Sequence, residues 1–84
     1  MEYTNHMTGL EFTAFRIRKN LSQSELALIL GVSVVTIKAW ERERRNVPLS
    51  INNFIRLSIA HASPEALKAM AERLKSFQKT PSDT

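Results

Sequence analysis

The residues best equipped for chemistry in this sequence are cations gathered in one short run. The run comprises Arg42, Arg44, Arg45 and Asn46. A guanidinium presents its N–H donors as a planar fork that matches phosphate and carboxylate oxygens, so the run predicts contact with a polyanion. The formal charge of +4 and the isoelectric point of about 10.0 agree with such a partner. The alternative is a solvated charged turn, because Glu41 and Glu43 lie in the same stretch and partly cancel its charge.

Other kinds of chemistry find no support in the residue types. The sequence has no cysteine, which excludes disulfides and thiolate metal sites and fits a reducing cytoplasm. His6 and His61 lie far apart and lack the spacing of metal ligands. No nucleophile, base and acid are arranged for catalysis. We therefore predict no catalytic residue, no bound metal and no cofactor.

The helices that precede the arginine run must position it. Ser22 and Glu25 form a capping box that starts one helix, and Gly31 stands where that helix would end in a left-handed residue. In the next helix, Ile37 and Trp40 are three residues apart and therefore share a face. Two helices joined by so tight a turn cross steeply, so the second helix is presented outward. The predicted arrangement is a helix-turn-helix.

Helical patterns cover most of the remaining chain, and no strand pattern or internal repeat is present. The expected helices are residues 9–19, 23–30, 34–43, 50–61 and 64–78, between a loose leader at 1–7 and a polar tail at 79–84. A chain of 84 residues allows one domain with a thin core. The sequence contains no signal-peptide pattern and no apolar run that could span a bilayer. We therefore expect a soluble cytoplasmic protein without a membrane partner.

Residues 21–48 resemble the Cro and phage-repressor type of helix-turn-helix, also called the Xre-like family. The matching residues are Leu21-Ser22-Gln23, Glu25-Leu26-Ala27, Leu30-Gly31-Val32-Ser33, Thr36-Ile37, Trp40-Glu41-Arg42 and Pro48. They align without insertion or deletion. The resemblance implies an all-α fold, a compact five-helix bundle of the lambda-repressor-like kind, whose third helix enters the major groove of double-stranded DNA.

The resemblance also places the base-reading residues in the third helix. They are Val34, Val35, Lys38 and Ala39. These residues depart from the glutamine and arginine usual in the family, because a valine can only contact a thymine methyl, whereas Lys38 can donate to guanine or to a phosphate. Val34 and Val35 lie about 100° apart on a helix, so both can hardly be buried with Ile37 and Trp40. We expect at least one valine to contact the groove; the alternative is that both are core or partner-facing residues.

Phosphate contacts are expected around the same helix. The residues concerned are Gln23, Ser33, Thr36, Arg42, Arg44, Arg45 and Asn46. Gln23 is assigned by resemblance, and the N-terminus of its helix would add a favourable dipole. The resemblance further implies an ion pair between Arg16 and Glu41 that holds the first helix against the third. Trp40 is expected in the core, although its indole N–H could instead reach a phosphate.

Three details of the outline concern the ends of two helices and the buried face of a third. Asn20 follows the first helix, where asparagine tolerates the left-handed conformation better than most residues. At Glu43, either the third helix continues by one more residue or the glutamate accepts a costly positive φ. The fourth helix should bury Ile51, Phe54, Ile55 and either Leu57 or Ile59.

The last expected helix carries an apolar stripe at steps of three and four residues. Its members are Leu67, Met70, Leu74 and Phe77. The stripe either packs on the first and fourth helices of the same chain or forms part of a twofold dimer interface. The resemblance favours a homodimer, since palindromic operators mirror protein symmetry.

Two functions fit these patterns. The first is a small dimeric repressor or autoregulator, of phage or mobile-element type, that binds an inverted-repeat operator. The second is an antitoxin-like interaction protein that binds a toxin or another regulator, with DNA binding secondary. The short chain leaves little room for a separate segment that would wrap a toxin.

Overall fold

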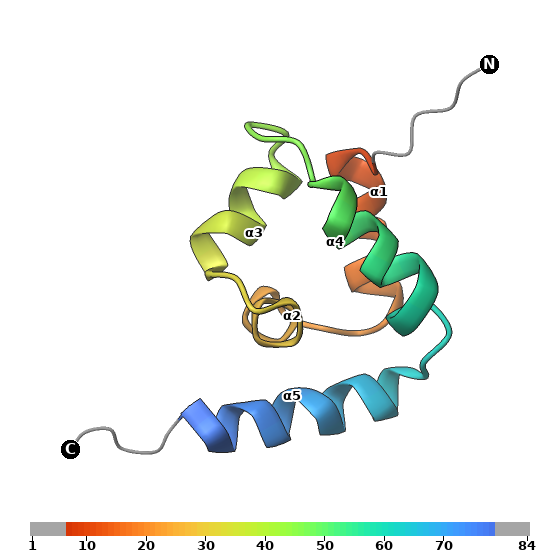
Figure 1. Cartoon of the computed structure of the whole chain (residues 1–84), viewed down its shortest axis with the longest axis vertical. Helices are drawn as coiled ribbons and strands as arrows, with labels where there is room; N and C mark the ends of the chain where they lie inside the picture. Colours follow the sequence, from red (N-terminus) through yellow and green to blue (C-terminus); the bar gives the residue numbers. More distant parts are fainter. Residues whose placement is uncertain (1–6, 79–84) are drawn as a thin grey trace.

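The computed structural model describes residues 7–78, which form five α-helices and no strand (Figure 1). The helices are α1 (Gly9–Arg18), α2 (Gln23–Leu30), α3 (Val34–Glu41), α4 (Leu49–Phe54), which continues as a π-helical segment (Ile55–Ile59), and α5 (Pro64–Gln78). The all-α prediction is therefore confirmed. Most of the expected leader and all of the expected tail, residues 1–6 and 79–84, lie outside the described residues. Met7, assigned to the leader, is half-buried and packs against the core.

Two capping boxes start the first two helices. The Thr8 hydroxyl accepts the Glu11 N–H at 3.0 Å, and the Glu11 carboxylate accepts the Thr8 N–H at 2.9 Å. Ser22 and Glu25 make the same two bonds at 3.0 and 2.8 Å. At α3, the Ser33 hydroxyl accepts the N–H of the third helical residue. These starts follow the sequence because each cap satisfies backbone donors that have no partner within the helix.

Left-handed residues end the same three helices. The φ angles are 59° at Asn20, 73° at Gly31 and 60° at Glu43, so two predicted positions are confirmed and Glu43 takes the costly alternative. The prediction that the third helix runs to Glu43 is wrong, because α3 ends at Glu41. Beyond that end, the Glu43 N–H bonds the Trp40 carbonyl at 3.0 Å and the Arg44 N–H bonds the Ala39 carbonyl at 2.9 Å. This pair of bonds is the Schellman pattern, which requires the positive φ.

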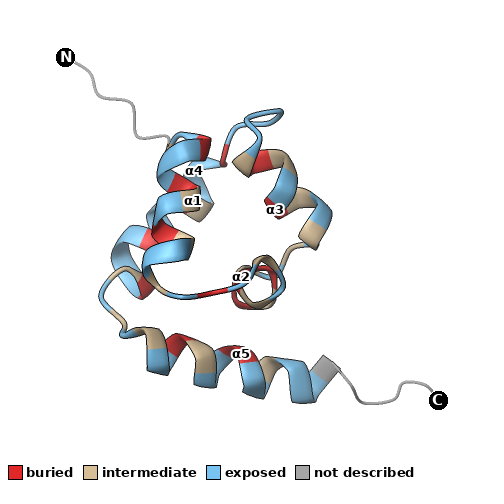
Figure 2. Cartoon of the chain, turned by 180° about the vertical axis from the view of Figure 1, so that it is seen from behind, coloured by how far each residue is buried: buried red, intermediate tan, exposed pale blue. Residues whose placement is uncertain are grey.

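The core lies where α1, α2, α3 and α4 face one another (Figure 2). Phe12 is fully buried and meets Trp40 edge to face, with ring centroids 5.5 Å apart, which fixes α3 against α1. Trp40 is 4% exposed, so the prediction that it belongs to the core is confirmed. Leu26 and Ile37, both 0% exposed, complete the centre.

The fourth helix buries a different face from the one predicted. Ile55 and Ile59 are buried as expected and Ile51 is half-buried. Phe54 is 40% exposed, so its assignment to the core is wrong; of the two alternatives, Ile59 is the buried residue and Leu57 is 80% exposed. Asn52 takes the inward place at 2% exposure. Phe54 and Ile55 are adjacent and point about 100° apart, so the narrow buried face accommodates only one of them. The π-helical segment widens the following turn.

Helix α5 packs chiefly against α2 rather than against α1 and α4 (Figure 1). Leu67 and Ala71 are 0% and 1% exposed in this contact. Beside them, the Lys68 ammonium lies 3.0 Å from a carboxylate oxygen of Glu25. Helix α5 therefore covers α2 and leaves the outward side of α3 uncovered.

No single helix among residues 7–78 is both long and apolar enough to cross a bilayer. Helices α2 and α3 would reach that length and composition only together, and they are bent by 109° from one another.

Candidate functional site

The angle of 109° between α2 and α3 presents one side of α3 to solvent. Ile37 and Trp40 face the core, at 0% and 4% exposure. On the opposite side, Val35 is 75% exposed and the side chains of Lys38 and Arg42 are also exposed. Val35 therefore keeps most of its apolar surface in solvent, on the same side of α3 as two exposed cations.

The outward side of α3 forms a shallow depression with the loop that follows it. The depression measures about 280 Å³ and is lined by Val35, Lys38, Ala39, Arg42 and Arg44. Three expected base-reading residues and two expected phosphate-contacting residues therefore lie together. An aliphatic floor with cations at its edge can contact an apolar group and neighbouring anions at once.

Val34 lies apart from this depression. It is half-buried, packs against the core and lines a separate hollow beside Gly31 and Leu28 of α2. The two adjacent valines thus face different surroundings, as their angular separation on the helix requires. Val35 is the outward one.

The loop after α3 carries cations that no carboxylate neutralises. Arg44, Arg45 and Asn46 are exposed, and among the described residues none of their side chains makes a hydrogen bond or ion pair. Glu41, expected as a partial counter-charge, is instead engaged by Arg16. Glu43 remains as the nearest exposed carboxylate. The loop therefore keeps most of its positive charge available to a partner.

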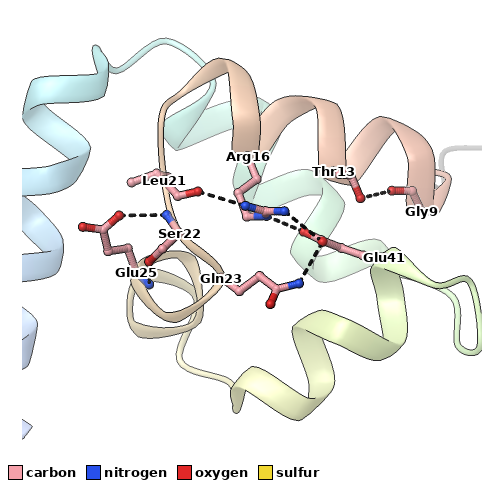
Figure 3. Close-up of polar contacts among 8 residues, drawn as sticks. All are labelled: Gly9, Thr13, Arg16, Leu21, Ser22, Gln23, Glu25 and Glu41. Atoms are coloured by element: carbon pink, nitrogen blue, oxygen red, sulfur yellow. Dashed lines mark hydrogen bonds and ion pairs between the residues drawn. The ribbon is translucent and has the colours of Figure 1, made fainter.

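A hydrogen-bonded network holds α3 in place (Figure 3). The Arg16 guanidinium donates through Nε to one carboxylate oxygen of Glu41 and through Nη2 to the other at 3.1 Å, so the predicted ion pair is confirmed. Its Nη1 also donates to the Leu21 carbonyl at 3.1 Å. The Gln23 amide donates to Glu41 at 3.0 Å. One carboxylate therefore joins α1, the start of α2 and the end of α3.

The contact with Glu41 restricts what Gln23 can do. An amide nitrogen carries two N–H donors, so one donor remains for a phosphate while the other bonds the carboxylate. Because Gln23 is half-buried, its amide is held in a defined orientation. The sequence did not reveal this bond, since residues 18 positions apart give no local signal.

The remaining expected phosphate contacts, Ser33 and Thr36, lie at the start of α3. Their hydroxyl oxygens are 3.0 Å apart, and Ser33 also caps the helix. Ser33 is exposed and Thr36 is half-buried. Their hydroxyls are therefore mutually oriented beside the outward side of α3.

The structure divides the apolar stripe of α5. Leu67 is 0% exposed and Leu74 is half-buried against the core, so both are used within the chain. Met70 and Phe77 are 37% and 75% exposed. These two members therefore keep more of their side-chain surface exposed to solvent than Leu67 and Leu74 do.

One carboxylate near α5 has a shifted pKa. The backbone N–H of Ser22 is the largest cause of the lowered pKa of Glu25, and the nearby Lys68 ammonium adds to it. Both stabilise the ionised form. Among residues 7–78, no group of three or more His, Cys, Asp or Glu side chains could hold a metal ion. The lowered pKa therefore belongs to a helix cap and an ion pair, away from the outward side of α3.

Comparison with known proteins gives one match. Residues 13–51 match a protein-family model described as a helix-turn-helix. The match begins within α1, includes α2 and α3, and ends in the first turn of α4. No curated protein and no solved structure matches the chain.

Proposed function

The chain belongs to the Xre/Cro-type helix-turn-helix family of DNA-binding regulators through residues 13–51, and on this basis we propose that it is a sequence-specific transcriptional repressor. One observation carries the proposal. The exposed side of α3 combines an aliphatic residue, Val35, with Lys38 and with arginines that have no carboxylate partner among the described residues. This combination suits base edges flanked by phosphates. The major groove of B-DNA, about 12 Å wide, admits an α-helix.

Base contacts are assigned to the outward residues of α3. Val35 contacts the C5-methyl group of a thymine, since a valine neither donates nor accepts hydrogen bonds. Lys38 donates to guanine O6 or N7, and Ala39 offers a second small apolar surface beside it. Val34 supports the helix from the core side and reaches a base only at its edge.

Phosphate contacts surround these residues. Arg42 caps the C-terminus of α3 on its outward side. The positively charged loop continues with Arg44, Arg45 and Asn46. Gln23 at the start of α2 uses its second N–H, where the helix dipole also favours an anion. The hydroxyls of Ser33 and Thr36 contact the backbone beside the first turn of α3. These contacts give the salt-dependent part of the affinity and do not themselves distinguish sequences.

The binding unit is a dimer on an inverted repeat, with half-sites about one helical turn, ~34 Å, apart. Support comes from the single α3 in each chain and from the exposed Met70 and Phe77 on α5. The exposed part of α5 then meets its copy, while Leu67 and Leu74 hold the helix to its own α2. Sedimentation of the complex with its operator tests this arrangement, and one chain per operator would reject it.

A second candidate function is the binding of a partner protein such as a toxin. Exposed apolar side chains away from α3 favour it, namely Leu10 and Ile17 on α1 and Leu57 after α4, at 74%, 62% and 80% exposure. Purification of the chain from its native host, followed by mass spectrometry, tests this candidate. A stoichiometric second protein that survives high salt would support it, whereas a homogeneous chain would not.

Selection from a random DNA pool tests the leading proposal. The chain should enrich one palindromic motif and bind it at least about 1,000-fold more tightly than unrelated DNA, the lower end of the usual range for specific regulators. Arg44→Ala and Arg45→Ala should weaken binding to every sequence similarly and flatten the log–log salt slope by about one unit per lost contact in each half-site. Arg56→Ala is the matched control, because this exposed arginine follows α4 and lies away from α3 and α5, which carry the proposed contacts. Enrichment of no motif, together with no binding at low salt, contradicts the proposal.

A further inference from the structure

A second hollow lies between α1 and α4, away from the outward side of α3. It measures about 650 Å³, which is within the usual size range of small-molecule sites. Its apolar walls include Ala14 and Phe15 of α1 together with Ile55 and Ala60 of the fourth helix and its continuation. The helix-turn-helix surface does not contribute to it.

Asn52 lies in this hollow and is unusual for its position. The residue is 2% exposed and is the one buried polar residue in the described part of the chain. Among the described residues, its side-chain amide has no hydrogen-bond partner. None of the described side-chain nitrogen or oxygen atoms is completely buried without a hydrogen-bond partner. The unpartnered amide of Asn52 must therefore keep a small contact with solvent, and the hollow that it lines provides it. Buried amides nearly always have a partner, and here two donors and an acceptor are left for a molecule in the hollow.

Two arginines provide charge at the same hollow. Arg18 of α1 and Arg56 after α4 both line it, are exposed, and have no ion-pair partner among the described residues. Glu11 also lines it, but one of its carboxylate oxygens is bonded to the Thr8 N–H in the capping box. The two arginines and the one glutamate give the lining a net charge of +1, which favours an anion. An arginine on each side can bind the two oxygens of one carboxylate.

We propose that the hollow between α1 and α4 binds a small organic carboxylate with an apolar body. The carboxylate accepts hydrogen bonds from the Asn52 amide and from the guanidinium groups of Arg18 and Arg56. The apolar body covers Phe15, Ile55 and the small residues beside them. The outward side of α3 stays free when the hollow is occupied, so this proposal does not depend on the proposed DNA binding.

Octanoate is a suitable probe, and NMR of the uniformly ¹⁵N-labelled full chain reports its binding. A ligand of this size should bind with a dissociation constant on the order of 1 mM. The largest shifts should be those of the Asn52 side-chain amide and the backbone amides of Ala14, Ile55 and Ala60. Octylamine, which reverses the charge, and octanol, which removes it, should each bind at least 10-fold more weakly.

The double variant Arg18→Gln, Arg56→Gln tests the charge requirement, and both sites are exposed, so the fold should persist. It should weaken octanoate at least 10-fold and leave octanol unchanged. Arg73→Gln, an exposed arginine of α5, is the control for general attraction to a basic protein. Equal affinity for octanoate and octylamine, shifts centred elsewhere, or full affinity in the double variant would each overturn the proposal.

Discussion

Replacement of Glu41 by glutamine should destabilise this domain strongly, although the side chain keeps its size. The wild-type carboxylate accepts three N–H groups, two from Arg16 and one from Gln23. It is 8% exposed, and the side chain of Arg16 is 17% exposed. In the variant, an amide NH₂ replaces one acceptor and faces the guanidinium, which is left without a counter-charge.

The cost follows from that burial. Breaking a buried ion pair by removing one partner costs roughly 3–5 kcal/mol. Arg16 keeps its bond to the Leu21 carbonyl and some solvent, so we expect ~2–3 kcal/mol. A domain of this length has a total free energy of unfolding of roughly 4–12 kcal/mol, so this loss is a large fraction of it. The same loss should lower the melting temperature by about 10–20 °C.

Urea denaturation followed by circular dichroism measures this change. Glu43→Gln is the matched control, because this glutamate is exposed and makes no ion pair among the described residues; its effect should stay within about 0.5 kcal/mol. Arg16→Met combined with Glu41→Gln should cost less than the sum of the two single changes, since the unpaired cation is then absent. A loss below about 0.5 kcal/mol for Glu41→Gln alone would refute the reasoning about the network.

Three further changes test the packing and the caps. Gly9→Ala should destabilise the domain by ~1–3 kcal/mol in urea denaturation, because its Cβ would lie 2.4 Å from the Trp40 carbonyl oxygen; unchanged stability would contradict this close contact. Glu43→Gly should raise the melting temperature, with a net gain of about 0.5–1 kcal/mol, since glycine takes the φ of 60° without strain; a lower melting temperature would count against it. Glu25 has a pKa below its ordinary value of 4.5, so its contribution to stability is present above that pH and is lost as the pH falls through the folded-state pKa. Lys68→Gln removes one cause of the lowered pKa, so it should cost up to ~1 kcal/mol at pH 7 and less at pH 3; an equal cost at both values would exclude the ion pair as its origin.

Helix starts could be predicted because their chemistry is local. Thr8, Ser22 and Ser33 each bond an N–H three residues ahead, and this spacing can be seen in the sequence. The left-handed residues Asn20 and Gly31 were predicted for the same reason. At Glu43 the sequence alone allows both a positive φ and one more helical residue, because glutamate gives no local signal that separates the two.

Contacts between helices determine which apolar residues of α4 and α5 are buried, and the sequence pattern alone does not give these contacts. Phe54 and Ile55 are both apolar, and only the position of α4 against α1 determines which one is buried. The stripe of α5 was recognised, but its contact with α2 depends on how the chain turns after Ala60. Asn52 gave no sequence signal for the hollow between α1 and α4, because a polar residue on a short amphipathic helix usually faces solvent.

The structure shows how the expected site residues are arranged, and their roles in DNA binding stay predictions. The resemblance indicated Val34 and Val35 together, and only the structure distinguishes the half-buried residue from the exposed one. The bond between Gln23 and Glu41 joins residues distant in the sequence, so no pattern could indicate it. The exposure of the loop arginines could be predicted from the sequence, because charged residues that follow a helix end usually lie in solvent.

The most direct test of the proposed recognition compares thymine with uracil in the selected half-site, position by position. Uracil lacks only the C5-methyl group, so at the base facing Val35 the wild-type chain should lose about fourfold in affinity, the value of one buried CH₂. Val35→Ala should reduce this difference and leave stability unchanged, because the side chain is 75% exposed. Val34→Ala should instead lower stability and keep the difference. If Val35→Ala retains the full thymine preference, the outward side of α3 does not read bases through this residue, and the proposed recognition of DNA is contradicted.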